Sequence, residues 1–168
     1  MGRLCHLVKH YGPLMARILI AQLFVISGFG KLAAFPKTAA FMANAGLPMP
    51  ELLLVLTIAL ELGGGVLLIL GWKTRWVAAG LFGFTLLATI KFHAFWAVEP
   101  ELIKSDMNNF MKNLAIMGAM LYIMAYGPGP LSLDKDDRVE DQAVPVPKPD
   151  AVSRTVGVSR KSRRRGRR

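Results

Sequence analysis

The chain has 168 residues, of which 53% are hydrophobic and 19% charged, and its mean hydropathy is +0.39. An average soluble domain is less apolar and has about 25% charged residues. The charge is uneven: residues 127–168 hold 11 of the 21 Lys and Arg and 6 of the 11 Asp and Glu, so the first 126 residues are strongly apolar. A single cysteine, Cys5, excludes an internal disulfide and an all-cysteine metal or iron–sulfur site within one chain. With only three histidines, no metal site is expected.

Four apolar segments predict membrane-spanning helices, since a span needs roughly 20 mostly apolar residues. They lie at 14–35, 52–70, 76–98 and 110–126. The clearest is 52–70, whose 19 residues include one charge, Glu61, and 13 Leu, Ile or Val. These aliphatic residues favour insertion by up to roughly 6 kcal/mol, against about 3 kcal/mol for a central carboxylate. A soluble four-helix bundle is the alternative, but its helices would each need a polar face, and 52–70 has none.

The sequence therefore predicts an all-α, polytopic membrane protein in three parts. A cytoplasmic N-terminal segment (1–13) precedes a four-helix membrane domain (14–130), and a disordered, basic cytoplasmic tail (131–168) follows. The first helix is expected to remain as an uncleaved signal anchor, because no small-residue cleavage site follows it.

Loop charges predict the orientation. Basic residues, among them Arg17, precede the first helix or lie at its start, and others occupy the 71–75 turn and the tail; these three regions share one side of a four-span chain. The opposite loops carry two lysines against Glu99, Glu101 and Asp106. The positive-inside rule then places both termini in the cytoplasm. The last nine residues contain seven cations, for which we expect an anionic lipid surface rather than nucleic acid or an acidic protein.

Polar residues gather in the outer half of the predicted bundle and come from all four helices. Ser27 and Lys31, like Asn109 and Asn113, are spaced i, i+4, so each pair shares one helix face. Turning these faces inward forms a polar pocket, with Glu61 beside Lys31 or Lys91, because a buried carboxylate without a cation would take up a proton. The candidate site residues are Ser27, Lys31, Glu61, Lys91, His93, Asn109, Lys112 and Asn113.

Ionisable residues inside a membrane are candidates for function. We expect Glu61 and His93 to act as catalytic, proton-handling groups, and the other six residues to bind ligand. Structural alternatives remain open. Glu61 would fix helix register in an ion pair, the lysines would snorkel to the interface, and His93 and the asparagines would serve packing. No intrinsic cofactor is expected, since a bis-histidine haem needs a second intramembrane histidine. A lipid-soluble quinone is the candidate electron carrier.

Several segments, read in order, resemble the DoxX family of small bacterial membrane proteins. The resemblance covers about residues 14–134 and uses all four predicted helices. It rests on Arg17 with the segment Phe24-Val25-Ile26-Ser27-Gly28-Phe29-Gly30-Lys31-Leu32, on Glu61-Leu62-Gly63-Gly64, on His93 with Phe95, on Phe110-Met111-Lys112-Asn113-Leu114-Ala115-Ile116-Met117-Gly118, and on Ser132-Leu133-Asp134.

The resemblance implies an inner-membrane four-helix bundle associated with quinol oxidase, thiosulfate:quinone oxidoreductase or thiol-handling complexes. The leading interpretation is an accessory subunit of a quinone- or thiol-linked membrane redox system. Its expected partners are membrane lipid, redox-enzyme subunits and further copies of the chain. Two alternatives stay open: a scaffold that recruits soluble partners through the tail, and a small-solute transporter, for which four helices without internal repeats are few.

Overall fold

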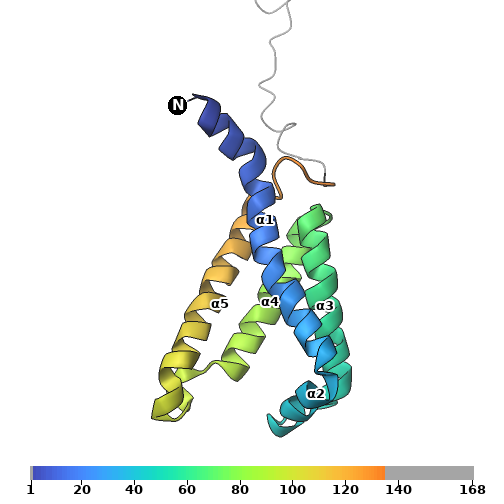
Figure 1. Ribbon diagram of the computed structural model, residues 1–168, viewed down its shortest axis with the longest axis vertical. Coiled ribbons are helices and arrows are strands. Elements are labelled where there is room, and N and C mark those ends of the chain that lie inside the picture. The colour runs from blue at the N-terminus through green and yellow to red at the C-terminus, as the bar shows by residue number, and fades with distance from the viewer. Residues whose placement is uncertain (1, 135–168) are drawn as a thin grey trace, which may run out of the picture. The chain divides into compact units, whose positions relative to one another are not determined.

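The computed structural model describes residues 2–134, and within them every regular element is helical (Figure 1). This confirms the all-α class. The elements in chain order are α1 (Gly2–Ala33), α2 (Phe35–Asn44), α3 (Pro50–Leu70), α4 (Thr74–Phe92), the 3₁₀ helix η1 (Phe95–Ala97) and α5 (Pro100–Tyr126).

Proline and glycine set most of the helix boundaries. Pro50 and Pro100 are the first residues of α3 and α5, where their fixed φ suits a helix and their missing N–H leaves no bond unmade. Gly71 ends α3 in the left-handed conformation, with φ of 69°, which a residue with a Cβ adopts only under strain.

The described chain has five α-helices where the sequence predicted four. The additional helix, α2, occupies the loop expected between the first two spans, and Pro36 lies in its first turn. α1 begins at Gly2 and continues through Pro13, so residues 2–13 extend the first helix. α4 ends at Phe92 rather than at 98, and α5 begins at Pro100 rather than at 110.

Three helical stretches of the described chain are long and apolar enough to cross a membrane: α1, α3 and Thr74–Ala97. α5 is also long, with 27 residues, but polar and charged side chains crowd its first half. Large apolar side chains cover the outside of the bundle, among them Ile26 (68% exposed), Trp76 (81%) and Leu87 (70%). Such a surface suits lipid, because a water-soluble monomer rarely exposes large continuous apolar patches.

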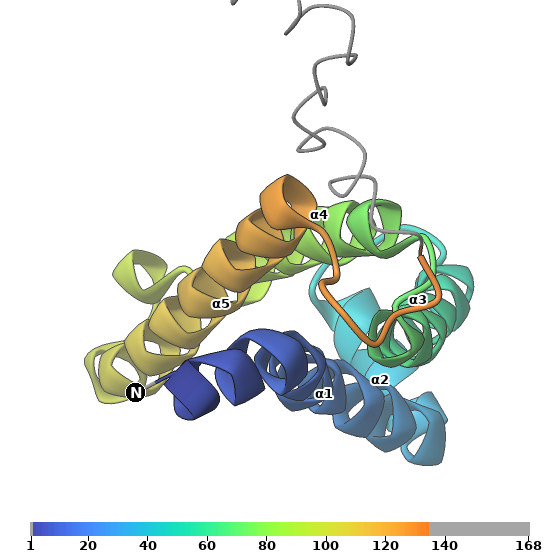
Figure 2. The same ribbon diagram turned by 90° about the horizontal axis from the view of Figure 1, so that it is seen from above.

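α1 packs against α3, and α4 packs against α5. The two pairs meet where α3 contacts α4 (Figure 2). The main core comprises the buried side chains Ala21, Phe24, Leu68, Ala78, Leu81, Met120 and Ile123. A smaller apolar cluster, which includes Met42 and Leu54, fixes α2 on α3.

Small residues bring α1 and α3 close together. A Cβ added to Gly65 would lie 2.7 Å from Val25 Cγ2, and one added to Gly28 would lie 2.8 Å from the Leu62 side chain. Gly63, in contrast, faces open space. The close approach of α3 to α1 therefore depends on Gly65 and not on Gly63.

At one end of the bundle, hydrogen bonds of Arg17 and Asp134 connect the helix ends. The Arg17 side chain is 1% exposed and donates hydrogen bonds to the carbonyl oxygens of Ile69 (3.1 Å) and Leu131 (2.6 Å). Asp134 accepts hydrogen bonds from the backbone N–H groups of Lys73 and Thr74, both at 2.7 Å. Residues 131–134 thus belong to the folded part, although the predicted tail began at 131. The prediction of a disordered, basic tail for the remaining residues falls outside the described residues.

Candidate functional site

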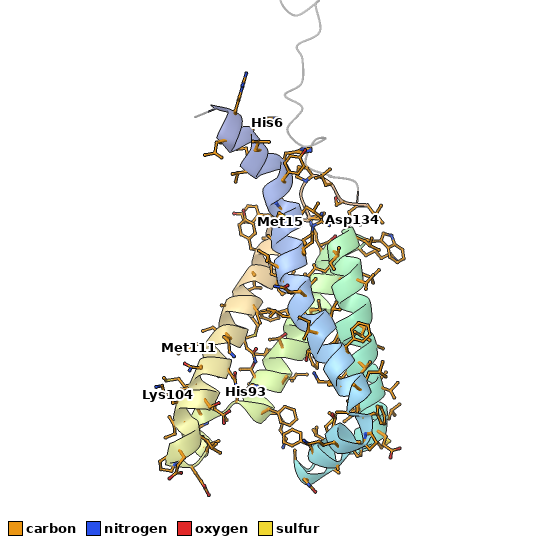
Figure 3. The ribbon with its side chains drawn as sticks, viewed as in Figure 1. His6, Met15, His93, Lys104, Met111 and Asp134 are labelled. Carbon is orange, nitrogen blue, oxygen red and sulfur yellow. The ribbon has the colours of Figure 1, made fainter. Side chains whose placement is uncertain are left out.

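A cavity of about 810 Å³ opens toward the end of the bundle opposite Asp134, and all five α-helices contribute to its wall. Figure 3 labels His93 at this end, with Lys104 and Met111 on the neighbouring part of α5 and Asp134 at the far end. Seven of the eight predicted site residues line the cavity: Ser27, Lys31, Glu61, His93, Asn109, Lys112 and Asn113. The structure does not bring Lys91 there; its side chain is exposed on α4.

Lys31, Ser27 and Glu61 form a closed polar cluster between α1 and α3. Lys31 Nζ lies 2.8 Å and 2.9 Å from the two carboxylate oxygens of Glu61 and donates a further hydrogen bond to Ser27 Oγ at 2.6 Å. Ser27 Oγ donates in turn to Glu61 Oε1 at 3.1 Å. Glu61 is 3% exposed, and Lys31, rather than Lys91, supplies the cation that the sequence required beside it.

The cluster leaves one hydrogen-bond donor of Lys31 available. Its ammonium group donates one N–H to Ser27 and a second to the Glu61 carboxylate, whose two oxygens are too close together to receive separate N–H bonds. The third N–H is free among the described residues, and the Lys31 side chain is 27% exposed. A ligand that reaches this wall of the cavity therefore meets a lysine donor beside the carboxylate acceptor.

The opposite wall joins α4 to α5. Asn113 Nδ2 donates to Thr89 Oγ1 at 2.9 Å, and the Thr89 hydroxyl donates to the Thr85 carbonyl oxygen at 2.6 Å. Nearby, His93 Nδ1 lies 3.5 Å from Asp106 Oδ1. Both side chains of this pair are partly exposed, at 29% and 19%. The contact is at the outer limit of a hydrogen bond, so a bound molecule can strengthen or replace it.

Two further polar side chains on this wall have no partner. Among the described residues, neither Asn109 nor Lys112 makes a side-chain hydrogen bond or an ion pair, and both line the cavity. On α5 they lie three residues apart and therefore share a face. They are further donors that a ligand can use.

The rest of the wall is apolar. Leu23, Phe24 and Ile116 lie further into the bundle along their helices than the polar residues, and the rings of Phe41 and Phe92, 5.5 Å apart, join α2 to α4. The cavity therefore has a polar end and an apolar end. Its volume falls in the range of small-molecule sites, about 300–1,000 Å³.

Asp106 and Thr38 also line the cavity and were missed from the sequence, and Thr57, which shares a helix face with Glu61, lines it too. Asp106 was counted as a loop charge because the fourth helix was expected to begin at 110. Once α5 is extended back to Pro100, Asp106 lies three residues before Asn109 on the same face. Because the predicted helix began too late, Asp106 was not recognised as the partner of His93.

These features define a helical membrane protein with a polar cavity inside its bundle. The sequence matches the DoxX family over residues 12–94. It is 36% identical over 122 residues to the inner membrane protein YphA of Escherichia coli, covering 73% of this chain and 87% of the relative. It is 41% identical over 128 residues to the inner membrane protein YqjF of the same organism, covering 76% and 93%.

The chain therefore belongs to the DoxX family, which confirms the resemblance inferred from its motifs. A shorter match, 34% identical over 79 residues, relates it to a Bacillus subtilis protein named "Putative oxidoreductase CatD", with 47% of this chain and 57% of the relative covered. No solved structure matches the chain.

Proposed function

We propose that the protein is an accessory subunit of a membrane redox system and that its cavity binds the head group of a lipid-soluble quinone. The observation that carries the proposal is the cavity itself, in which two titratable residues, Glu61 and His93, line one space with an apolar end. A ring with polar oxygens and an apolar side chain complements such a space. The likeness to the CatD protein of Bacillus subtilis supports a redox role.

Proton handling follows from the two walls. A quinone takes up two protons when it is reduced by two electrons, and the quinol returns them when it is oxidised. Glu61 would exchange one proton with a ligand oxygen, while Lys31 holds the carboxylate in place. His93, which lies beside Asp106 in the cavity wall, would exchange the other, since an imidazole can both accept and donate a proton. The electrons would pass to or from a redox partner subunit.

The proposal includes four membrane crossings with both termini in the cytoplasm. α5 supports this count, because His93 meets Asp106 near its start, while residues just beyond its end meet Arg17 at the other end of the bundle. At about 1.5 Å per residue, its 27 residues extend about 40 Å, enough to cross a bilayer. The cavity then opens toward the outer leaflet. A reporter that is active only outside the cytoplasm should be inactive after Arg168 and active after residue 98; the reverse pattern would refute the orientation.

Binding of short-chain quinones to the purified protein in lipid nanodiscs tests the function directly. We expect saturable binding by the wild type and weaker, less pH-dependent binding by Glu61→Gln, which keeps the shape of the side chain but cannot exchange a proton. Glu51→Gln, on the exposed first turn of α3, is the matched control and should bind as the wild type does. Absence of quinone binding by the wild type would refute the proposal and favour a structural role for the polar cluster.

A further inference from the structure

The hydrogen bonds between α4 and α5 determine which way the Asn113 amide points. Thr89 has one hydroxyl hydrogen, and it is donated to the Thr85 carbonyl oxygen at 2.6 Å. Thr89 Oγ1 can therefore only accept from Asn113. The NH₂ group of Asn113 must therefore face Thr89, and Nδ2 lies 2.9 Å from Thr89 Oγ1. With the amide turned the other way, two oxygens that can only accept would face each other.

This arrangement leaves the oxygen of Asn113 as the atom that the residue offers to a ligand. Asn113 lines the cavity, and its Oδ1 has no hydrogen-bond partner among the described residues. An amide oxygen accepts hydrogen bonds and cannot donate them. The ligand atom beside it must therefore carry a hydrogen.

Donors for the same head group lie one turn away. Among residues 2–134, Asn109 and Lys112 have no side-chain partner; the Lys112 ammonium presents N–H groups only, and the Asn109 amide presents both N–H groups and an oxygen. Glu61, across the cavity, adds a second acceptor beside the free N–H of Lys31. The site thus offers acceptors at Asn113 and Glu61 and donors at Lys31 and Lys112, with Asn109 able to do either, which matches a group that both donates and accepts. A hydroxyl does both, whereas a quinone carbonyl only accepts.

We infer that the cavity selects a hydroxylated head group, so that, of a quinone pair, the reduced hydroquinone binds more tightly, with Asn113 as the residue that determines this preference. The inference rests on the proposed function and specifies the ligand form that the site recognises. A site with a fixed acceptor disfavours an analogue without the matching hydrogen, because the partly buried oxygen then loses its partner in the ligand.

The experiment compares three probes under anaerobic conditions in nanodiscs: a short-chain hydroquinone, its dimethyl ether and the corresponding quinone. The ether keeps the ring and oxygens but has lost both hydroxyl hydrogens. We expect the wild type to bind the hydroquinone about tenfold more tightly than the ether or the quinone. Binding of all three with equal affinity would overturn the inference while leaving the proposed function intact. No binding of any probe would overturn both.

Variants separate the role of Asn113 from general damage to the fold. Asn113→Leu should abolish the preference. Thr89→Val should weaken it although Asn113 is still present, because valine cannot accept the amide hydrogen and the amide is free to turn. Thr89→Ser keeps the hydroxyl oxygen that accepts from Asn113, so this variant should retain the preference for the hydroquinone. Asn108→Leu alters an exposed neighbour outside the cavity and should bind as the wild type does. An unchanged preference in both Asn113→Leu and Thr89→Val would overturn the inference.

Discussion

Lys31 Nζ lies 2.8 Å from Glu61 Oε1 and 2.9 Å from Oε2, which joins α1 to α3 through an ion pair in the cavity wall. The two residues are unequal, because Glu61 is almost fully buried while about a quarter of Lys31 remains exposed. Burial of a carboxylate is costly unless a cation and hydrogen bonds compensate it. The pair therefore fixes the contact between the two helices and compensates the burial of the carboxylate.

Removal of either partner should destabilise the bundle more than removal of both. Lys31→Met leaves a buried carboxylate without a cation, and we expect a loss of about 3 kcal/mol in the free energy of unfolding. Lys31→Met combined with Glu61→Gln should recover part of that loss, since no unpaired charge remains. Thermal unfolding of the four proteins in one detergent measures the coupling. Additive effects would mean that the two side chains do not stabilise each other.

Substitution of alanine in the three consecutive glycines of α3, residues 63–65, should change stability by an amount that depends on the position. Gly65→Ala should lower the unfolding temperature, because the new methyl group would lie 2.7 Å from Val25 and force α1 away from α3. Overpacking of this kind costs about 1–3 kcal/mol. Gly63→Ala, with no atom within 4 Å of the new Cβ, should be neutral or slightly stabilising. Equal effects at the two positions would contradict the observed helix contact.

Arg17→Lys should destabilise the end of the bundle opposite the cavity. The guanidinium group reaches carbonyl oxygens of α3 and of Leu131 at once, and an ammonium group cannot reproduce this fork. We expect a loss of about 1–3 kcal/mol, the cost of leaving a buried polar group unpaired. Arg3→Lys, on the exposed start of α1, is the control. Stability equal to the wild type would show that Arg17 serves only as a topology signal.

Asp134 should make part of the stability depend on pH. Burial raises the pKa of its carboxyl group, but hydrogen bonds from Thr74 and Lys73 and the charge of Arg17 outweigh this effect and lower the pKa below its usual value. The unfolded value is about 3.9, so the stabilisation is complete above about pH 5 and is lost as the pH falls through the folded-state pKa.

Asp134→Asn therefore tests the cap that Asp134 forms at the start of α4. At pH 7 the variant should be less stable than the wild type by about 1 kcal/mol, as for other helix caps. The difference in unfolding temperature should shrink as the pH falls below 4. A difference that stays constant between pH 7 and pH 3 would contradict a role for the charged form.

Hydrophobicity made the helical membrane class predictable, because it is a property of whole segments such as 52–70. Most of the polar residues that line the cavity were also predictable, since i, i+4 spacing determines which side chains share a helix face. The choice of Lys31 over Lys91 as the partner of Glu61 was not, because it depends on how α1 and α4 are rotated in the bundle. Periodicity within one helix carries no information about that rotation.

Arg17 and Asp134 show a second limit of the sequence. Arg17 was interpreted as a flanking basic residue, and Asp134 as part of a disordered tail. Their contacts join positions 51 to 114 residues apart. Such long-range polar contacts leave no local pattern. Only the folded chain places both residues at the junction of α3 and α4.

The central claim is that side chains of all five α-helices form one cavity that holds a lipid-soluble quinone or quinol. Native mass spectrometry of the protein released from nanodiscs tests this claim most directly, because it weighs the ligand and the chain together. We predict that the wild type carries one quinone or quinol mass per chain, that Glu61→Gln carries less of it, and that Asn113→Leu carries no more quinol than quinone. A wild-type protein that retains lipid but no such molecule, even after incubation with excess quinol, would contradict the claim.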